Sequence, residues 1–138
     1  MRVMLVALAL SASLPLTAHA AAPVNGNWFS DNKDSVVTIG QCGAVVCGKI
    51  SKILAPTKDG KPAVDENNPN PALRKRPILG LELLSGFKDG GKEWIGTIYD
   101  PRAGKVYKST LTRLVNGNLK VKGCWGPFCK SVYFTPVK

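Results

Sequence analysis

The sequence predicts an all-β fold, an eight-stranded antiparallel up-and-down barrel with one long loop that carries a short helical turn. Segments rich in Val, Ile, Thr and aromatic residues recur along the chain, and residues typical of tight turns separate nearly all of them. Antiparallel strands joined in order tend to close, because an open sheet leaves unpaired edges. A two-sheet sandwich is the alternative, but it usually needs Greek-key crossovers, and only one connection here is long.

The turn residues set the expected strand boundaries. Asn116-Gly117 is a strong hairpin signal, Asp89-Gly90-Gly91 favours another hairpin, and the turn after Asp100-Pro101 is completed by Gly104. Between such turns the strands show the alternation of apolar and polar residues that a half-buried strand needs. The predicted strands span residues 26–30, 35–41, 46–54, 78–87, 93–99, 105–114, 118–124 and 130–137.

The regular pattern stops from residue 55 to residue 77, where five of the ten prolines lie. Asn70 is the expected N-cap of a short helical turn, with Pro71 at its first position and residues 72–75 completing it. A loop this long inside a compact domain usually has a function. We therefore expect residues 56–76 to form a lid over one mouth of the barrel.

Residues 1–20 have the features of a secretory signal peptide. Arg2 supplies the charged start, residues 3–16 form an apolar run, and Ala18-His19-Ala20 is a typical cleavage site. The run is too short for a membrane anchor, which needs about 20 apolar residues. We expect cleavage near Ala20, a periplasmic or secreted location, and a single β-barrel domain over residues 21–138 with no transmembrane segment.

Removal of the signal peptide would change the chemistry of the chain. His19 is the only His, so Ser–His and Cys–His nucleophile pairs and His metal sites are excluded from the mature protein. We therefore expect no enzyme and no cofactor. Loss of Arg2 leaves 18 basic and 9 acidic residues, a formal charge of +9 that favours anionic surfaces. The three Trp lie in separate hairpins, which fits barrel plugging and turn packing, and we expect no nucleic-acid partner.

The four cysteines predict two disulfides. Cys42 and Cys47 have the same Cys-x4-Cys spacing as Cys124 and Cys129, and each pair spans a predicted hairpin turn of four residues. Residues that flank such a turn face each other at a distance that a disulfide can bridge, and exported domains meet oxidising conditions. Zinc is the alternative, but four-Cys zinc sites usually use Cys-x2-Cys pairs. We expect Cys42–Cys47 and Cys124–Cys129 bridges and no metal site.

Several motifs resemble those of a known family. They are Gly26-Asn27-Trp28, Cys47-Gly48, the run from Asn68-Pro69 to Gly80-Leu81, Ile98-Tyr99-Asp100-Pro101 and Gly104-Lys105-Val106-Tyr107. In this order they resemble the bacterial exported family known as domain of unknown function 2147. The resemblance implies a lipocalin-like or calycin-like barrel in the periplasm, with no established reaction. The likeness of Gly26-x-Trp28 to the opening of a lipocalin barrel also implies that Trp28 plugs the closed end, with Arg113 as the candidate to cover it.

Six residues are candidates for ligand contact: Arg74, Arg76, Asp65, Glu82, Tyr107 and Trp94. Guanidinium groups bind carboxylate and phosphate in a bidentate manner, so Arg74 or Arg76 could hold an anionic head group. The alternative is that both arginines pair with Asp65 and Glu66 and fix the loop. If Glu82 points into the barrel, it needs a partner such as Arg113.

We predict that the barrel binds a small lipophilic or amphiphilic ligand. The alternative is a structural or interaction protein of the cell envelope, with a filled barrel and a basic surface that contacts anionic lipid or polysaccharide. The interior separates the two hypotheses, because an open barrel favours ligand binding and a filled one favours the envelope role.

Overall fold

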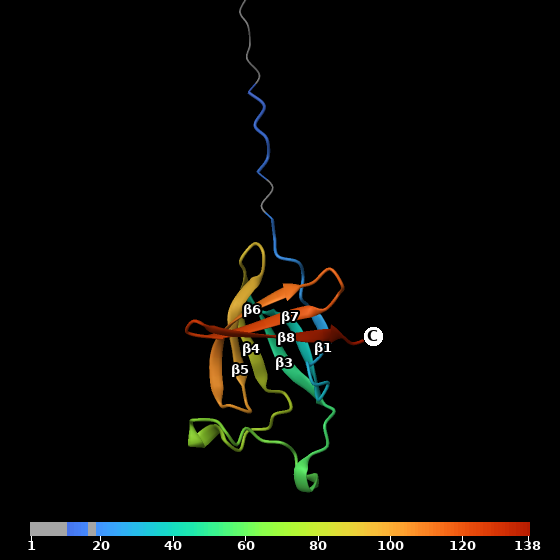
Figure 1. Ribbon diagram of the computed structural model, residues 1–138, viewed down its shortest axis with the longest axis vertical. Coiled ribbons are helices and arrows are strands. Elements are labelled where there is room, and N and C mark those ends of the chain that lie inside the picture. The colour runs from blue at the N-terminus through green and yellow to red at the C-terminus, as the bar shows by residue number, and fades with distance from the viewer. Residues whose placement is uncertain (1–10, 17–18) are drawn as a thin grey trace, which may run out of the picture.

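The structure is a computed structural model that describes residues 11–16 and 19–138 (Figure 1). Residues 1–10 and 17–18 of the predicted signal peptide lie outside the described residues. Within the described part of the chain, no helix has the length and apolar character needed to cross a membrane.

Eight antiparallel strands form one closed barrel in sequence order, which confirms the predicted fold. Each strand pairs with the next along the chain. Pairing of Trp28 with Pro136 and of Phe29 with Thr135 joins the first strand to the last and completes the ring. The strands are β1 (Gly26–Phe29), β2 (Ser35–Cys42), β3 (Val45–Ile53), β4 (Glu82–Asp89), β5 (Trp94–Asp100), β6 (Lys105–Arg113), β7 (Leu119–Trp125) and β8 (Phe128–Pro136).

The predicted strand boundaries are correct within two residues, except at the start of β4. That strand begins at Glu82 rather than at residue 78. Ile78 still belongs to the long loop, because its N–H donates to the Ala63 carbonyl oxygen at 3.0 Å. Gly80 then turns the chain with a φ of 87°, a conformation that glycine adopts without strain.

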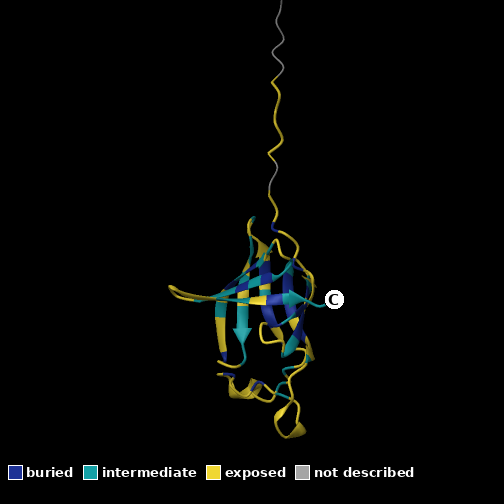
Figure 2. Cartoon of the chain, turned by 45° about the vertical axis from the view of Figure 1, so that its right-hand side comes forward, coloured by how far each residue is buried: buried dark blue, intermediate teal, exposed yellow. Residues whose placement is uncertain are grey.

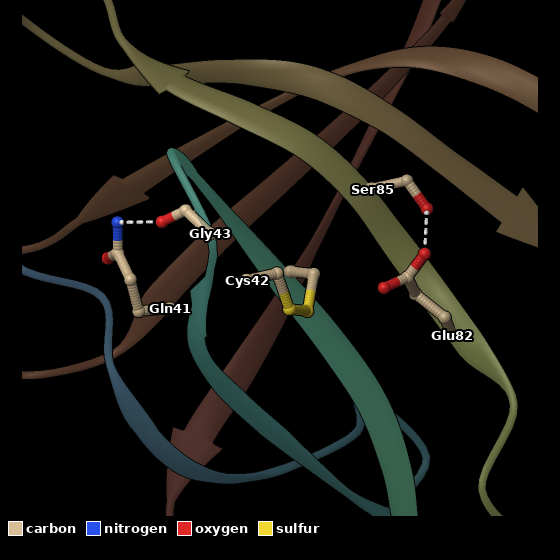
Figure 3. The surroundings of a disulfide bond; sticks show 6 residues. Gln41, Cys42, Gly43, Glu82 and Ser85 are labelled. Atoms are coloured by element: carbon tan, nitrogen blue, oxygen red, sulfur yellow. Dashed lines mark hydrogen bonds between the residues drawn. A yellow bond between two sulfur atoms is a disulfide. The ribbon is translucent and has the colours of Figure 1, made fainter.

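Both predicted disulfides, Cys42–Cys47 and Cys124–Cys129, are present. The predicted four-residue turns are wrong, because only residues 43–44 and residues 126–127 lie between the paired strands. Each turn begins with a glycine of positive φ, which permits a two-residue hairpin turn. Figure 3 shows the first bridge beside the carboxylate of Glu82. Because its sulfur atoms are bonded to each other, they are not available as thiolate ligands for a metal.

Trp28 fills one end of the barrel. Trp28 is 1% exposed, and its Nε1–H donates to the Val24 carbonyl oxygen at 3.0 Å. The guanidinium carbon of Arg113 lies 4.7 Å from the Trp28 ring centroid, a favourable cation–π contact. This geometry agrees with the two roles that the family resemblance implied. The other core residues are Val24, Val37, Ile39, Val46, Ile50, Leu83, Leu84, Phe87, Leu111, Leu119, Val121 and Phe134.

The long loop between β3 and β4 lies at the opposite end of the barrel and is mostly exposed (Figures 1 and 2). It contains two short 3₁₀ helices, η1 (Lys58–Gly60) and η2 (Pro71–Leu73). The predicted N-cap is confirmed, because Asn70 Oδ1 accepts a hydrogen bond from the Ala72 N–H at 3.1 Å. The helical turn is shorter than predicted, since η2 ends at Leu73.

Gly96→Ala should destabilise the barrel. A Cβ at this position would lie 2.6 Å from the Ser85 carbonyl oxygen and 2.7 Å from Cγ of Phe87. Such overpacking typically costs about 1–3 kcal/mol of unfolding free energy. Gly40→Ala is the matched control, because a Cβ at Gly40 would meet nothing within 4 Å. Urea denaturation should show a lower midpoint for Gly96→Ala alone, and equal midpoints would contradict this account of the packing.

Candidate ligand-binding cavity

A cavity of about 890 Å³ occupies the part of the barrel interior away from Trp28. It opens at the end where the long loop and the turns that follow β1, β5 and β7 come together. Inward-facing residues alternate along each strand, so neighbouring strands together present a continuous apolar wall. The wall includes Val37, Ile50, Ile53, Leu83, Ile98, Val121, Val132 and Phe134.

The rim of the cavity is polar and carries charges of both signs. Asp34 borders it from the β1–β2 turn, Asp100 from the end of β5, Arg102 from the β5–β6 turn, and Lys130 from β8. Nε of Arg102 lies 3.4 Å from Oδ1 of Asp100, and both side chains are partly exposed. The long loop contributes Glu66 and its neighbours to the same rim, so part of the predicted lid borders the mouth.

Asp65 attaches the long loop to the barrel. Its side chain is 0% exposed and accepts hydrogen bonds from Tyr99 Oη at 2.7 Å, Asn68 Nδ2 at 2.8 Å and Arg76 Nε at 2.8 Å. Burial by itself raises the pKa of this carboxyl, but the three donors and the Arg76 charge outweigh burial and hold the pKa below its usual value. The pKa of Tyr99 is raised by burial and by its hydrogen bond to the Asp65 carboxylate.

Asn67 provides a second attachment between the loop and the barrel. Its Nδ2 group donates to the Arg102 carbonyl oxygen at 3.2 Å. Gly104, with a φ of 62°, lies so close to the Asn67 carbonyl group that any Cβ would overlap it. The motifs around Tyr99 and Gly104 and the motif of the long loop are far apart in the sequence, yet they meet beside the cavity mouth.

The predicted arginines hold the loop. Nε of Arg76 pairs with Asp65, and Nε of Arg74 donates to the Asn68 carbonyl oxygen at 2.8 Å. Neither side chain lines the cavity, and of the six candidates only Tyr107 does so within the described residues. These contacts agree with the alternative in which the arginines fix the loop. A head group at their remaining N–H groups stays a prediction.

Glu82 and Trp94 lie away from the cavity. Glu82 is exposed and accepts a hydrogen bond from Ser85 Oγ at 3.1 Å, so the buried Glu82 considered from the sequence does not occur. The pairing of β4 with β3 is irregular between Glu82 and Leu84, which places these two residues on different faces. Trp94 is partly buried, and its Nε1–H donates to the Ala22 carbonyl oxygen at 2.9 Å.

Among the mouth residues that sequence reasoning missed are Arg102, Trp125, Phe128 and Lys130. They lie in or beside two turns that are far apart in the sequence. The available signal was topological, because the connections after the first, third, fifth and seventh strands of an up-and-down barrel all lie at the same end.

Asp65→Asn should destabilise the protein and reduce its sensitivity to acid. The folded pKa of Asp65 is below its unfolded value of about 3.9. The Asp65 carboxylate therefore makes its full contribution to the free energy of unfolding above the unfolded pKa. This contribution is lost as the pH falls through the folded pKa. Removing one partner of a buried ion pair costs about 3–5 kcal/mol, and we expect about 3 because Arg76 is 35% exposed.

Chemical denaturation at pH 7 and at pH 3 tests this expectation. The wild type should lose more stability between the two pH values than Asp65→Asn does. Asp59→Asn, an exposed position in the same loop, is the control and should behave as the wild type. The same pH dependence in wild type and Asp65→Asn would refute the role of this carboxylate.

Comparison with known proteins agrees with this architecture. A family model described as an uncharacterized protein conserved in bacteria (domain of unknown function 2147) matches residues 26–136. A solved structure described as protein HP1028 from the human pathogen Helicobacter pylori, of the lipocalin family, is similar with a TM-score of 0.72 and 22% identity, over 86% of this chain and 85% of that chain. No curated protein matches the sequence. With a lipocalin-like fold and a family match over most of its length, the chain belongs to the bacterial family of domain of unknown function 2147.

Proposed function

We propose that the protein binds a small lipophilic or amphiphilic molecule inside its barrel. The open cavity of about 890 Å³, with an apolar wall and a charged rim, is the observation that carries this proposal. Ligand sites usually have volumes of about 300–1,000 Å³ and apolar linings with a few polar groups. An eight-stranded barrel has room for one small ligand. An open interior supports this function over the envelope role with a filled barrel.

The cavity defines how such a ligand would lie. Its apolar part would contact the inner wall, for example Leu83, Ile98 and Val121, and its polar part would remain at the rim. Arg102 and Asp100 place both charges at that rim. A head group that carries charge or several hydrogen-bonding groups therefore fits the rim.

Gly123→Leu should block ligand binding without disturbing the fold. Gly123 of β7 lines the cavity, and a Cβ there would lie 3.6 Å from Ile98 Cγ2 and 3.7 Å from Tyr107 Cβ, which are ordinary contacts. The leucine side chain would occupy space that the ligand needs. We expect the affinity for a fluorescent fatty acid to fall about tenfold or more, which corresponds to about 1.4 kcal/mol.

Gly40→Leu is the matched control, because it adds the same side chain to β2 at a position that does not line the cavity. Its affinity should equal that of the wild type, and circular dichroism should show that both variants fold. Saturable binding that Gly123→Leu leaves intact would place the ligand elsewhere. No saturable binding by the wild type would overturn the proposed function.

We also propose that the chain is exported and cleaved after Ala20. Ala21 is 7% exposed, whereas His19 and Ala20 are exposed, so burial begins at the proposed new terminus. The Ala21 backbone nitrogen lies 3.0 Å and 3.2 Å from the two carboxylate oxygens of Asp89. Cleavage would convert this amide into an α-ammonium group and the hydrogen bond into an ion pair. The two disulfides support an oxidising compartment.

Protein recovered from a periplasmic extract should begin at Ala21 when its N-terminus is sequenced. Asp89→Asn should lower the thermal midpoint of this mature chain more than that of a chain with an acetylated N-terminus, because only the free α-ammonium group pairs with Asp89. A different first residue would contradict the cleavage site. Equal shifts in the two backgrounds would contradict the ion pair.

A further inference from the structure

Trp125 and Phe128 form an exposed aromatic lip at the cavity mouth. They are paired residues at the ends of β7 and β8, and both border the cavity. Trp125 is 58% exposed and Phe128 is 77% exposed. The hairpin that carries them projects from the barrel wall in both views (Figures 1 and 2). Trp125 therefore lies beside a hairpin turn, as the sequence indicates, but most of it is exposed, because this hairpin extends beyond the packed wall.

The hairpin that carries the aromatic lip is braced by a disulfide, and the Trp125 ring is braced by its neighbours. The Cys124–Cys129 disulfide joins the two strands directly before the turn. The Tyr107 ring contacts the Trp125 ring edge-on, with 5.8 Å between the centroids, and Lys105 Nζ lies 5.4 Å from the same Trp125 ring. A fixed hairpin loses little conformational entropy when its side chains enter another environment.

The strands that carry the aromatic lip are strongly basic. All 9 acidic residues lie between Asp31 and Asp100, and residues 101–138, which contain β6, β7 and β8, have no Asp or Glu. The basic residues in that segment are Arg102, Lys105, Lys108, Arg113, Lys120, Lys122, Lys130 and Lys138. Even with Arg102 paired to Asp100, this side of the barrel combines a net positive charge with exposed aromatic rings.

We propose that the cavity-mouth end of this side of the barrel docks on an anionic membrane, with the aromatic lip inserted among the lipid head groups. Trp is enriched at membrane–water interfaces, where its ring and its N–H group are both satisfied. Acidic lipids attract the lysines, and that attraction orients the lip toward the bilayer. The cavity mouth would then face the lipid phase, from which a lipophilic ligand could enter. Membrane docking itself does not depend on the proposed ligand binding.

Vesicle flotation tests the docking. The wild type should float with vesicles of phosphatidylethanolamine and phosphatidylglycerol, and far less with neutral phosphatidylcholine vesicles. Trp125→Ser and Phe128→Ser should each lower the partition coefficient about tenfold, because each removes an aromatic side chain that the interface would bury. Tyr133→Ser is the matched control, since Tyr133 is an aromatic residue of β8 that is 49% exposed but does not border the cavity.

Fluorescence quenching by brominated lipids identifies the inserted residue. Trp28 is buried at the far end of the barrel, and Trp94 is partly buried at the same end beside Ala22. Quenching of the wild type should therefore come from Trp125. Trp125→Phe should still float, because it keeps an aromatic ring in the lip, but it should lose the quenching.

Two results would overturn the proposal. One is a wild type that does not float with the anionic vesicles. The other is flotation that Trp125→Ser and Phe128→Ser leave unchanged, since this would indicate a general polyanion-binding surface. Gly123→Leu should float as the wild type does while losing the fatty acid, so failure of docking and failure of ligand binding can be distinguished.

Discussion

The buried carboxylate of Asp65 is the interaction on which the open end of the barrel depends. A fully buried charge is tolerated only where donors and an opposite charge surround it, and Tyr99, Asn68 and Arg76 supply them. Tyr99 belongs to β5, and the other residues belong to the long loop. The Asp65 carboxylate therefore joins the long loop to the barrel wall. The rim exists in its present shape because this loop has a fixed position.

The two ends of the barrel differ in how closely other atoms pack against inward-facing glycines. At the closed end the Phe87 ring fills the space beside Gly96, and the buried Trp28 side chain fills the end of the barrel. Toward the open end, the nearest atom that a Cβ at Gly123 would meet is 3.6 Å away, and the cavity begins there. The same residue type therefore permits dense packing in one place and leaves room for a ligand in the other.

Most of the fold could be predicted from the sequence because its signals are local. The Asn116-Gly117 turn, the N-cap at Asn70 and the paired cysteines each depend on a few neighbouring residues. The candidate site depends on contacts between distant segments, so Asp65 was recognised as part of it but its partner Tyr99 was not. The start of β4 also depends on a contact between distant segments. Ile78 has the residue type of a strand, but its N–H donates to the Ala63 carbonyl oxygen of the long loop.

The ring of strands is weakest where β1 meets β8. In the described chain this seam has two paired positions, whereas every other pair of neighbouring strands has at least three. Local opening begins where few backbone hydrogen bonds must break, so the barrel should unzip along this line before it unfolds elsewhere. The Val137 N–H donates to the Asn27 carbonyl oxygen at 3.0 Å, which places the last residues beside the first strand. A circularly permuted chain, with its original ends linked across the seam, would convert the weakest line of the barrel into one more hairpin.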